Sequence, residues 1–240
     1  WGQNPWWATH TEINDDTRDR LIGSAGLRYD ILDWLYVSGR VGMDWASRKE
    51  TSLTPQGTGY NLGGNMTEAN ITTREINMEW ILGMDKTWGE IGLNAFVGGN
   101  KMERSWERIS ADGNGFNVDF FEAINNAAVR NYGYGFNQSG INSLFGSVEL
   151  NWKNLVYLTA TGRNDWFSVL NPESGNEIFY PSVGGTWIFS DTFESTSSWL
   201  SFGKLRASWA QVGLVTIGPY ATNLEYALRG ETHLGRPMAG

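Results

Sequence analysis

The sequence contains no cysteine and only two histidines, which limits the catalytic and metal-binding sites that it can form. Without cysteine there is no disulfide and no thiolate metal site. His10 and His233 lie far apart in expected loops, so neither a Ser–His–Asp triad nor a His-Glu-x-x-His zinc site is supported. Loop carboxylates such as Glu103 and Asp119 are usually solvated. We therefore expect no enzyme, no cofactor and no metal site.

Long apolar runs and an excess of positive charge are missing as well. No run approaches the roughly 18 apolar residues that a membrane-spanning helix needs. The 26 acidic residues outnumber the 18 basic ones, and a formal net charge of −8 argues against a nucleic-acid partner. The chain is instead rich in aromatic residues, with 13 Trp, 9 Tyr and 11 Phe, and it has 30 glycines. This mixture suits a β architecture that binds carbohydrate or carries an aromatic belt at a membrane interface.

Apolar and polar residues alternate from Leu144 to Trp152 and again from Val156 to Gly162. Alternation places successive side chains on opposite faces of a strand, and the polar turn at Lys153-Asn154 predicts a hairpin. The same unit recurs along the chain, so we expect eight strands in pairs. The expected pairs are Leu21–Tyr29 with Leu35–Trp45, Ile76–Met84 with Ile91–Val97, Leu144–Trp152 with Val156–Gly162, and Val183–Phe189 with Leu205–Trp209.

The connections within pairs are short, whereas those between pairs are long. The expected long loops are Ala46–Thr73, Gly98–Ser139, Asn164–Ile178 and the tail after Val212, with a short helix within Val118–Ala128. This rhythm is typical of transmembrane barrels with short periplasmic turns and long extracellular loops, whose strands need about 9–11 residues to span. A soluble sandwich or propeller also alternates and remains an alternative.

Charged residues within the expected strands all fall on the polar face. A charge facing lipid at mid-membrane costs about 2–4 kcal/mol, so we expect this face to line the lumen. The residues concerned are Arg28, Arg40, Glu79, Glu149, Lys204 and Arg206. Aromatic residues near strand ends fit an interfacial belt. These are Tyr29, Trp34, Trp45, Trp88 and Trp152.

Four ordered segments of the second half carry a family resemblance. They are Leu144–Trp152, Tyr157–Ser168, Phe179–Trp187 and Lys204–Gly213, and Asn4–Trp7, Asp19–Gly23 and Ile217–Tyr220 fit the same pattern. Together they resemble the β-barrel of SusC/RagA-type TonB-linked outer-membrane transporters of Bacteroidota, over nearly the whole chain. The resemblance implies an all-β, antiparallel transmembrane barrel of about 22 strands, of which residues 1–240 are an internal segment of about eight. The plug, the N-terminal regions and the TonB-contacting box are then expected outside this segment.

The resemblance also implies a function and a set of partners. Such a protein would import glycans or peptides across the cell outer membrane, together with a SusD-like surface lipoprotein. TonB would act through parts of the parent protein outside this segment, and outer-membrane lipid would surround the barrel. Two alternatives stay open: an accessory barrel subunit of a larger complex, and a soluble Trp-rich domain that binds carbohydrate.

We expect substrate contacts from aromatic and amide side chains in the long loops. Aromatic rings can stack on a sugar or pack on a peptide, and amides can donate and accept hydrogen bonds. The candidates are Trp106, Asn131, Tyr132, Tyr134, Phe136, Asn137 and Trp166. The alternative is that they pack the loops together or contact the lipoprotein. A calcium-like run, Asp112–Gly115 followed by Asp119, lacks the glutamate spacing of a calcium loop.

Overall fold

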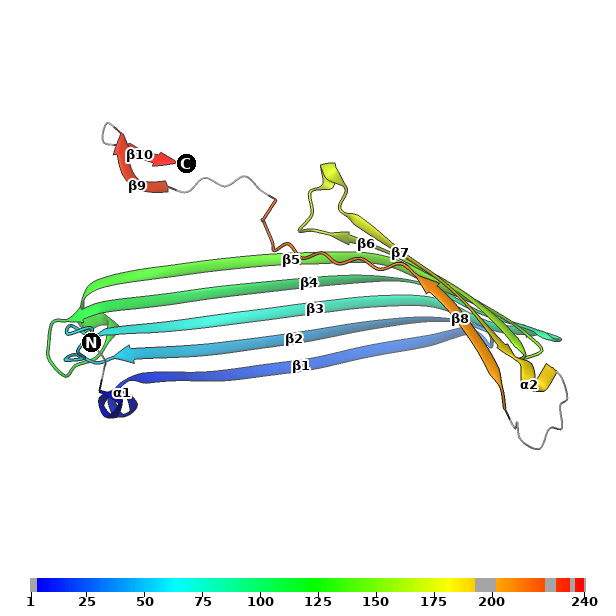
Figure 1. The fold of residues 1–240 in the computed structure, drawn as a ribbon, viewed down its shortest axis with the longest axis horizontal. Helices are drawn as coiled ribbons and strands as arrows, with labels where there is room; N and C mark the ends of the chain where they lie inside the picture. The colour runs from blue at the N-terminus through cyan, green and yellow to red at the C-terminus, as the bar shows by residue number, and fades with distance from the viewer. Residues whose placement is uncertain (1–3, 193–201, 223–227, 234–235, 240) are drawn as a thin grey trace.

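The computed structural model describes residues 4–192, 202–222, 228–233 and 236–239. Eight strands form one antiparallel sheet in which every strand pairs with its neighbours in the sequence (Figure 1). They are β1 (Ile13–Leu32), β2 (Leu35–Thr54), β3 (Asn65–Trp88), β4 (Ile91–Phe116), β5 (Ala127–Trp152), β6 (Val156–Phe167), β7 (Glu177–Ile188) and β8 (Lys204–Ala210). The expected all-β antiparallel architecture is thus confirmed, and the sheet does not close on itself within the described residues.

The remaining elements are short. Two helical turns border the sheet, two more lie in its loops, and a separate strand pair stands away from it (Figure 1). They are α1 (Pro5–Thr11), η1 (Ile124–Asn126), η2 (Pro172–Ser174), α2 (Phe189–Thr192), β9 (Leu228–His233) and β10 (Arg236–Ala239). None of the described helices is both long and apolar enough to cross a membrane.

Five strands are much longer than the alternation predicts, with 20 residues in β1 and β2, 24 in β3 and 26 in β4 and β5. The expected loops Ala46–Thr73 and Gly98–Ser139 are therefore wrong, because only residues 55–64 and 117–126 connect the strands. Polar residues such as Asn, Ser and Thr occur on both faces of these extensions, so the strict alternation fades there. Backbone pairing with the neighbouring strand needs no apolar side chains and continues nonetheless.

The expected helix within Val118–Ala128 is also wrong, because the segment forms a tight loop that ends in η1. The Asn126 amide fixes this loop: its Nδ2 donates to the carbonyl of Val118 at 2.9 Å, and its Oδ1 accepts from the Val118 amide at 3.1 Å. An asparagine that bonds to nearby backbone offers the chain an alternative to a helix. The third expected loop is shorter as well, since only residues 168–176 separate β6 from β7.

The turn at Lys153-Asn154 is confirmed. Both residues have positive φ, 52° and 57°, and the Leu155 amide donates to the Trp152 carbonyl at 2.9 Å. Positive φ at both central residues defines a type I′ turn, whose twist matches that of a hairpin.

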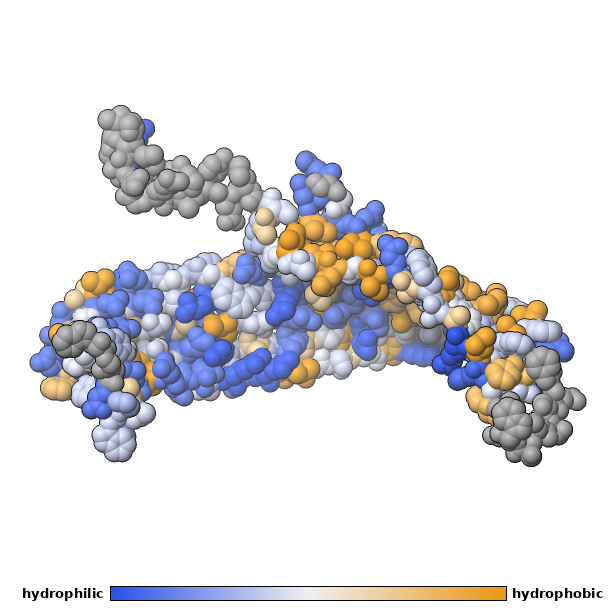
Figure 2. Space-filling model, viewed as in Figure 1, coloured by the Kyte–Doolittle hydropathy of each residue, from blue (hydrophilic) through white to orange (hydrophobic). Residues whose placement is uncertain are grey.

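The register separates an apolar face from a polar face over the strand halves that carry the short turns. The expected charged residues all share the polar face, where Arg40 forms an ion pair with Glu79 at 3.2 Å. On the apolar face one cross-strand row holds Trp88, Ile91, Trp152, Val156, Trp187 and Leu205, next to the turns. Figure 2 shows hydrophilic side chains over the opposite ends of β1 to β5 and more hydrophobic ones towards the short turns.

The border of the apolar band shifts from strand to strand. Trp45 of β2 pairs with Arg74 of β3, and Met78 of β3 pairs with Lys101 of β4. The band is therefore oblique to the cross-strand rows, so the strands must tilt with respect to it. Tilt with a stagger in the register is the geometry of a barrel wall.

Candidate functional site

The seven candidate residues lie on strands, so their expected placement in loops is wrong. Their local sequence is rich in Gly, Asn and Ser, but it is paired on β4, β5 and β6. Trp106 belongs to β4, Trp166 belongs to β6, and β5 carries Asn131, Tyr132, Tyr134, Phe136 and Asn137.

The register divides these residues between the two faces. Trp106 pairs directly with Asn137, and Asn131 follows on the same polar face. Tyr132, Tyr134, Phe136 and Trp166 project from the opposite face, since side chains alternate along a strand. The structure therefore does not gather all seven candidates into one stacking site. Contact of any of them with substrate stays a prediction.

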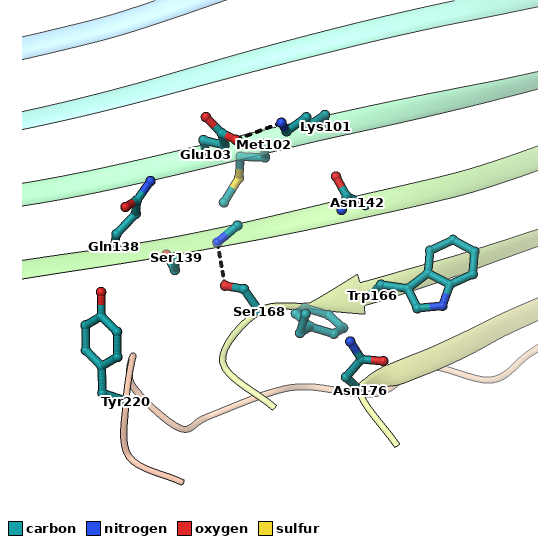
Figure 3. A pocket seen from close by; sticks show the side chains of 12 residues that line it. Lys101, Met102, Glu103, Gln138, Ser139, Asn142, Trp166, Ser168, Asn176 and Tyr220 are labelled. Carbon is teal, nitrogen blue, oxygen red and sulfur yellow. Dashed lines mark hydrogen bonds and ion pairs between the residues drawn. The ribbon is translucent and has the colours of Figure 1, made fainter. Parts of the chain in front are cut away.

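A cavity of about 540 Å³ opens where β6 ends beside β5 (Figure 3). Its lining includes Trp166 from β6, Gln138 and Asn142 from β5, and Tyr220 from the segment after β8. Gly140 and Ser168 also line the cavity, and the Gly140 amide donates to Ser168 Oγ at 2.7 Å. Lys101 Nζ lies 2.8 Å from Glu103 Oε1, and this contact lowers the pKa of the Glu103 carboxyl.

A smaller cavity of about 230 Å³ lies on the polar face. Its lining comprises Arg104, Trp106, Asn137, Ser139 and Pro219. The Trp106 ring lies over Gly135, where an added Cβ would stand 3.1 Å from the Cζ3 atom of the ring. Pro219 and Tyr220 were not among the candidates. The only signal for them was their place in the family-like run Ile217–Tyr220.

The aromatic residues of β5 on the other face are open to solvent. Tyr132 is 69% exposed, Tyr134 60% and Phe136 44%. The Tyr134 hydroxyl donates to Glu107 Oε1 at 3.1 Å, and this bond to an anion raises the pKa of the Tyr134 phenol. Tyr132 also borders a cavity of about 500 Å³ with Lys49 and Glu68.

The described residues contain no cluster of three or more His, Asp or Glu side chains that could hold a metal ion. Asp112, from the calcium-like run, lies on β4 and accepts a hydrogen bond from Thr67 Oγ1 at 2.7 Å. The polar face instead carries ion pairs between neighbouring strands, among them Arg20–Asp44 and Arg48–Asp16 at 3.1 Å. This surface can bind and orient a polar solute through charges, amides and the Trp106 ring.

Comparison with known proteins places the chain in a family. The model of the family described as "TonB dependent receptor-like, beta-barrel" matches residues 1–227. TonB-dependent receptor P26 of Formosa agariphila is 26% identical over 230 residues, which cover 91% of this chain and 23% of that protein. The chain thus spans less than a quarter of that relative.

Solved structures share the fold. The structure of the RagAB peptide transporter aligns with a TM-score of 0.86 and 17% identity, covering 98% of this chain and 27% of that one. The RagAB peptide importer in its "open-open" state aligns with a TM-score of 0.85 and 17% identity, and the alignment covers 98% of this chain and 26% of that one. Since the family match includes all eight strands of the large sheet, the chain belongs to the β-barrel family of TonB-dependent receptors.

Proposed function

We propose that these residues form part of the wall of an outer-membrane importer that takes up peptides or oligosaccharides together with a SusD-like surface lipoprotein. The observation that carries the proposal is the two-faced sheet. Over the same strands, one face presents an apolar band bordered by Trp88, Trp152 and Trp187, and the other presents charges such as Arg40 and Glu79. A wall between lipid and a polar lumen needs this arrangement.

The long strands support a role outside the membrane as well. About 9–11 residues suffice to span a bilayer, whereas β4 and β5 have 26 each. Their remaining parts carry polar residues on both faces and border the cavities beside Trp106 and Trp166. In this proposal they stand on the extracellular side, where substrate and lipoprotein arrive. The solved neighbours are named as peptide transporters, which favours peptides over oligosaccharides.

The test uses the full-length parent gene in its own host. A deletion strain is supplied with a mixed peptide digest or with mixed oligosaccharides as the sole nutrient, and growth is compared with that of the complemented strain and of a strain lacking TonB. We expect the protein in the outer-membrane fraction, a surface lipoprotein co-purifying with it, and loss of growth on one nutrient class in both mutants.

Other results would favour the other functions. Unchanged growth on both nutrient classes, with the protein still in a larger outer-membrane complex, would favour an accessory barrel subunit. Recovery of the full-length protein in the soluble fraction, with carbohydrate affinity, would favour a soluble binding domain.

A further inference from the structure

The first half of β5, residues 127–139, has a free edge on the side where β6 pairs with the second half. β6 pairs with β5 only from Ile141 to Trp152, and beyond it Ser168 bonds to Gly140. Residues 127–139 therefore pair with β4 alone among the described parts of the chain. The amide and carbonyl of Gly140 point towards the side of β6. Because these directions alternate along a strand, the backbone N–H and C=O groups of every second residue from Gln138 back to Ala128 point to the same unpaired side. Tyr132, Tyr134 and Phe136 are among these residues.

This edge has little of the usual protection against strand addition. Natural edges are blunted by lysine, proline, bulges or a covering segment. Residues 127–139 contain a single charged residue, Arg130, and neither lysine nor proline, and their pairing with β4 is continuous in register from Val129 to Ser139. Pro219 and Tyr220 line cavities with Asn137, Gln138 and Ser139, so they approach the edge at its end next to β6. A strand that stays open in this way is a template for an extended peptide.

The two faces beside the edge offer different contacts to an added strand. Tyr132, Tyr134 and Phe136 form an exposed aromatic row on one face. On the other face Gly133 and Gly135 have no side chains, and the Trp106 ring lies over Gly135. Side chains of a bound strand could thus reach across β5 towards β4.

Two arginines of β4 lie within that reach on the same face as Trp106. Arg104 and Arg108 flank Trp106 at alternate positions, opposite Ser139 and Gly135. Arg20, Arg40 and Arg48 form ion pairs on this face, but neither Arg104 nor Arg108 does so within the described residues. Among the described residues, Arg108 donates one long hydrogen bond, 3.4 Å, to Ser110 Oγ. Asp44 interacts electrostatically with Arg104 on this face, and Glu75 lies opposite Arg104 in the register. Guanidinium N–H groups that are not engaged in an ion pair can still bind an acidic ligand.

We propose that an extended acidic peptide binds to the free edge of β5 as an added strand, with its carboxylates directed to Arg104 and Arg108 over the Trp106 ring. The inference rests on the proposed import function and specifies its substrate class. Main-chain hydrogen bonds supply affinity that is independent of sequence, and the arginines select acidic side chains.

The test measures binding of labelled peptides to the full-length transporter with its lipoprotein, by fluorescence anisotropy. The probes are an extended peptide rich in Asp and Glu, its Asn and Gln counterpart, and an acidic oligosaccharide. Tyr134→Pro removes one edge N–H, which edge strands tolerate, while Tyr134→Ala removes the side chain alone. The double variant Arg104→Gln, Arg108→Gln removes the charges, and Arg74→Gln, on the opposite face, is its matched control.

We expect Tyr134→Pro to weaken both peptides about tenfold beyond Tyr134→Ala, because a main-chain hydrogen bond is lost. The double arginine variant should weaken only the acidic peptide, by about tenfold or more, and Arg74→Gln should weaken neither. In hydrogen exchange of the wild type, the amides of Tyr132, Tyr134 and Phe136 should exchange fast alone and slowly with the acidic peptide.

Three results would overturn the inference: equal binding by the proline and alanine variants, slow exchange of these amides without peptide, or preference for the acidic oligosaccharide. Slow exchange without peptide would mean that another segment of the protein already covers the edge. If the wild type still imports peptides and Tyr134→Pro changes nothing, the edge site is refuted and the importer stands. If the wild type imports neither nutrient class, the proposed function fails.

Discussion

Several glycines of the sheet lie beneath aromatic rings from a neighbouring strand. A Cβ on Gly83 would meet the Tyr36 ring, and one on Gly99 would meet the Trp80 indole. Rings that cover strand glycines shield the backbone there and restore some of the packing that glycine lacks. These glycines therefore serve close packing, whereas Gly89, with φ of +59°, serves the turn between β3 and β4.

The close packing around Gly98 predicts that a larger residue there destabilises the sheet. A Cβ there would lie 2.7 Å from the Trp80 carbonyl oxygen and 2.8 Å from the Phe145 ring, so Gly98→Ala forces backbone and ring apart. We expect a loss of about 1–3 kcal/mol in stability, measured by thermal unfolding of the full-length protein in detergent. Gly23→Ala is the control, since nothing stands within 4 Å of its Cβ position, and it should be neutral. Equal melting temperatures for both variants would contradict this packing.

Tyr134 gives a prediction about pH. Its hydrogen bond to Glu107 disfavours the phenolate and raises the phenol pKa. The stabilisation is fully present below the ordinary tyrosine pKa and is lost as pH rises through the raised value. Glu107→Gln should lower the Tyr134 pKa. The Tyr134 titration is isolated by subtracting the ultraviolet titration curve of the matching Tyr134→Phe variant from that of the protein with Tyr134. An unchanged Tyr134 pKa in Glu107→Gln would rule the bond out.

At the scale of the strand, the two faces of β5 should tolerate charge differently. Val148 lies on the apolar face, in the row with Ala95, Ala160 and Val183, and its neighbour Ser147 lies on the polar face. Val148→Arg should cost about 2–4 kcal/mol if the apolar face meets lipid, and Ser147→Arg should cost clearly less. For each variant, the amount of protein assembled into the outer membrane and the melting temperature of the assembled protein are measured. A reversed order of the two variants would invert the assigned faces.

The strand halves next to the short turns could be predicted from the sequence, because lipid or core contact on one face enforces strict alternation. The halves beyond the apolar band could not, since Thr, Asn, Gly and Ser occupy both of their faces. In β3, for example, Asn70 and Thr72 continue the strand through backbone pairing with Lys49 and Ser47. Pairing of this kind depends on the neighbouring strand and leaves little pattern in the chain itself.

At the scale of the whole molecule, β1 and β8 each have one unpaired edge in the described sheet. Large hydrophobic side chains on the apolar face are also exposed, including Leu27 at 78% and Leu158 at 59%. We therefore expect residues 1–240, produced alone, to associate into large species in buffer without detergent, because open edges and apolar patches pair with other copies. Size-exclusion chromatography with light scattering tests this. A stable monomer without detergent would favour the soluble carbohydrate-binding domain.

The antiparallel hairpins, the assignment of charges such as Arg40 and Glu79 to one face, and the family all follow from the amino-acid sequence. Alternation and turn chemistry are local, so a single chain displays them. The length of the strands and the sharing of a face among the candidates, in contrast, became known from the folded chain. The fold brought Trp106 and Asn137 together, placed Tyr132 and Tyr134 on the opposite face, and left the β5 edge open beyond β6. These features depend on register and on strand ends, which hydrogen bonds between distant residues establish.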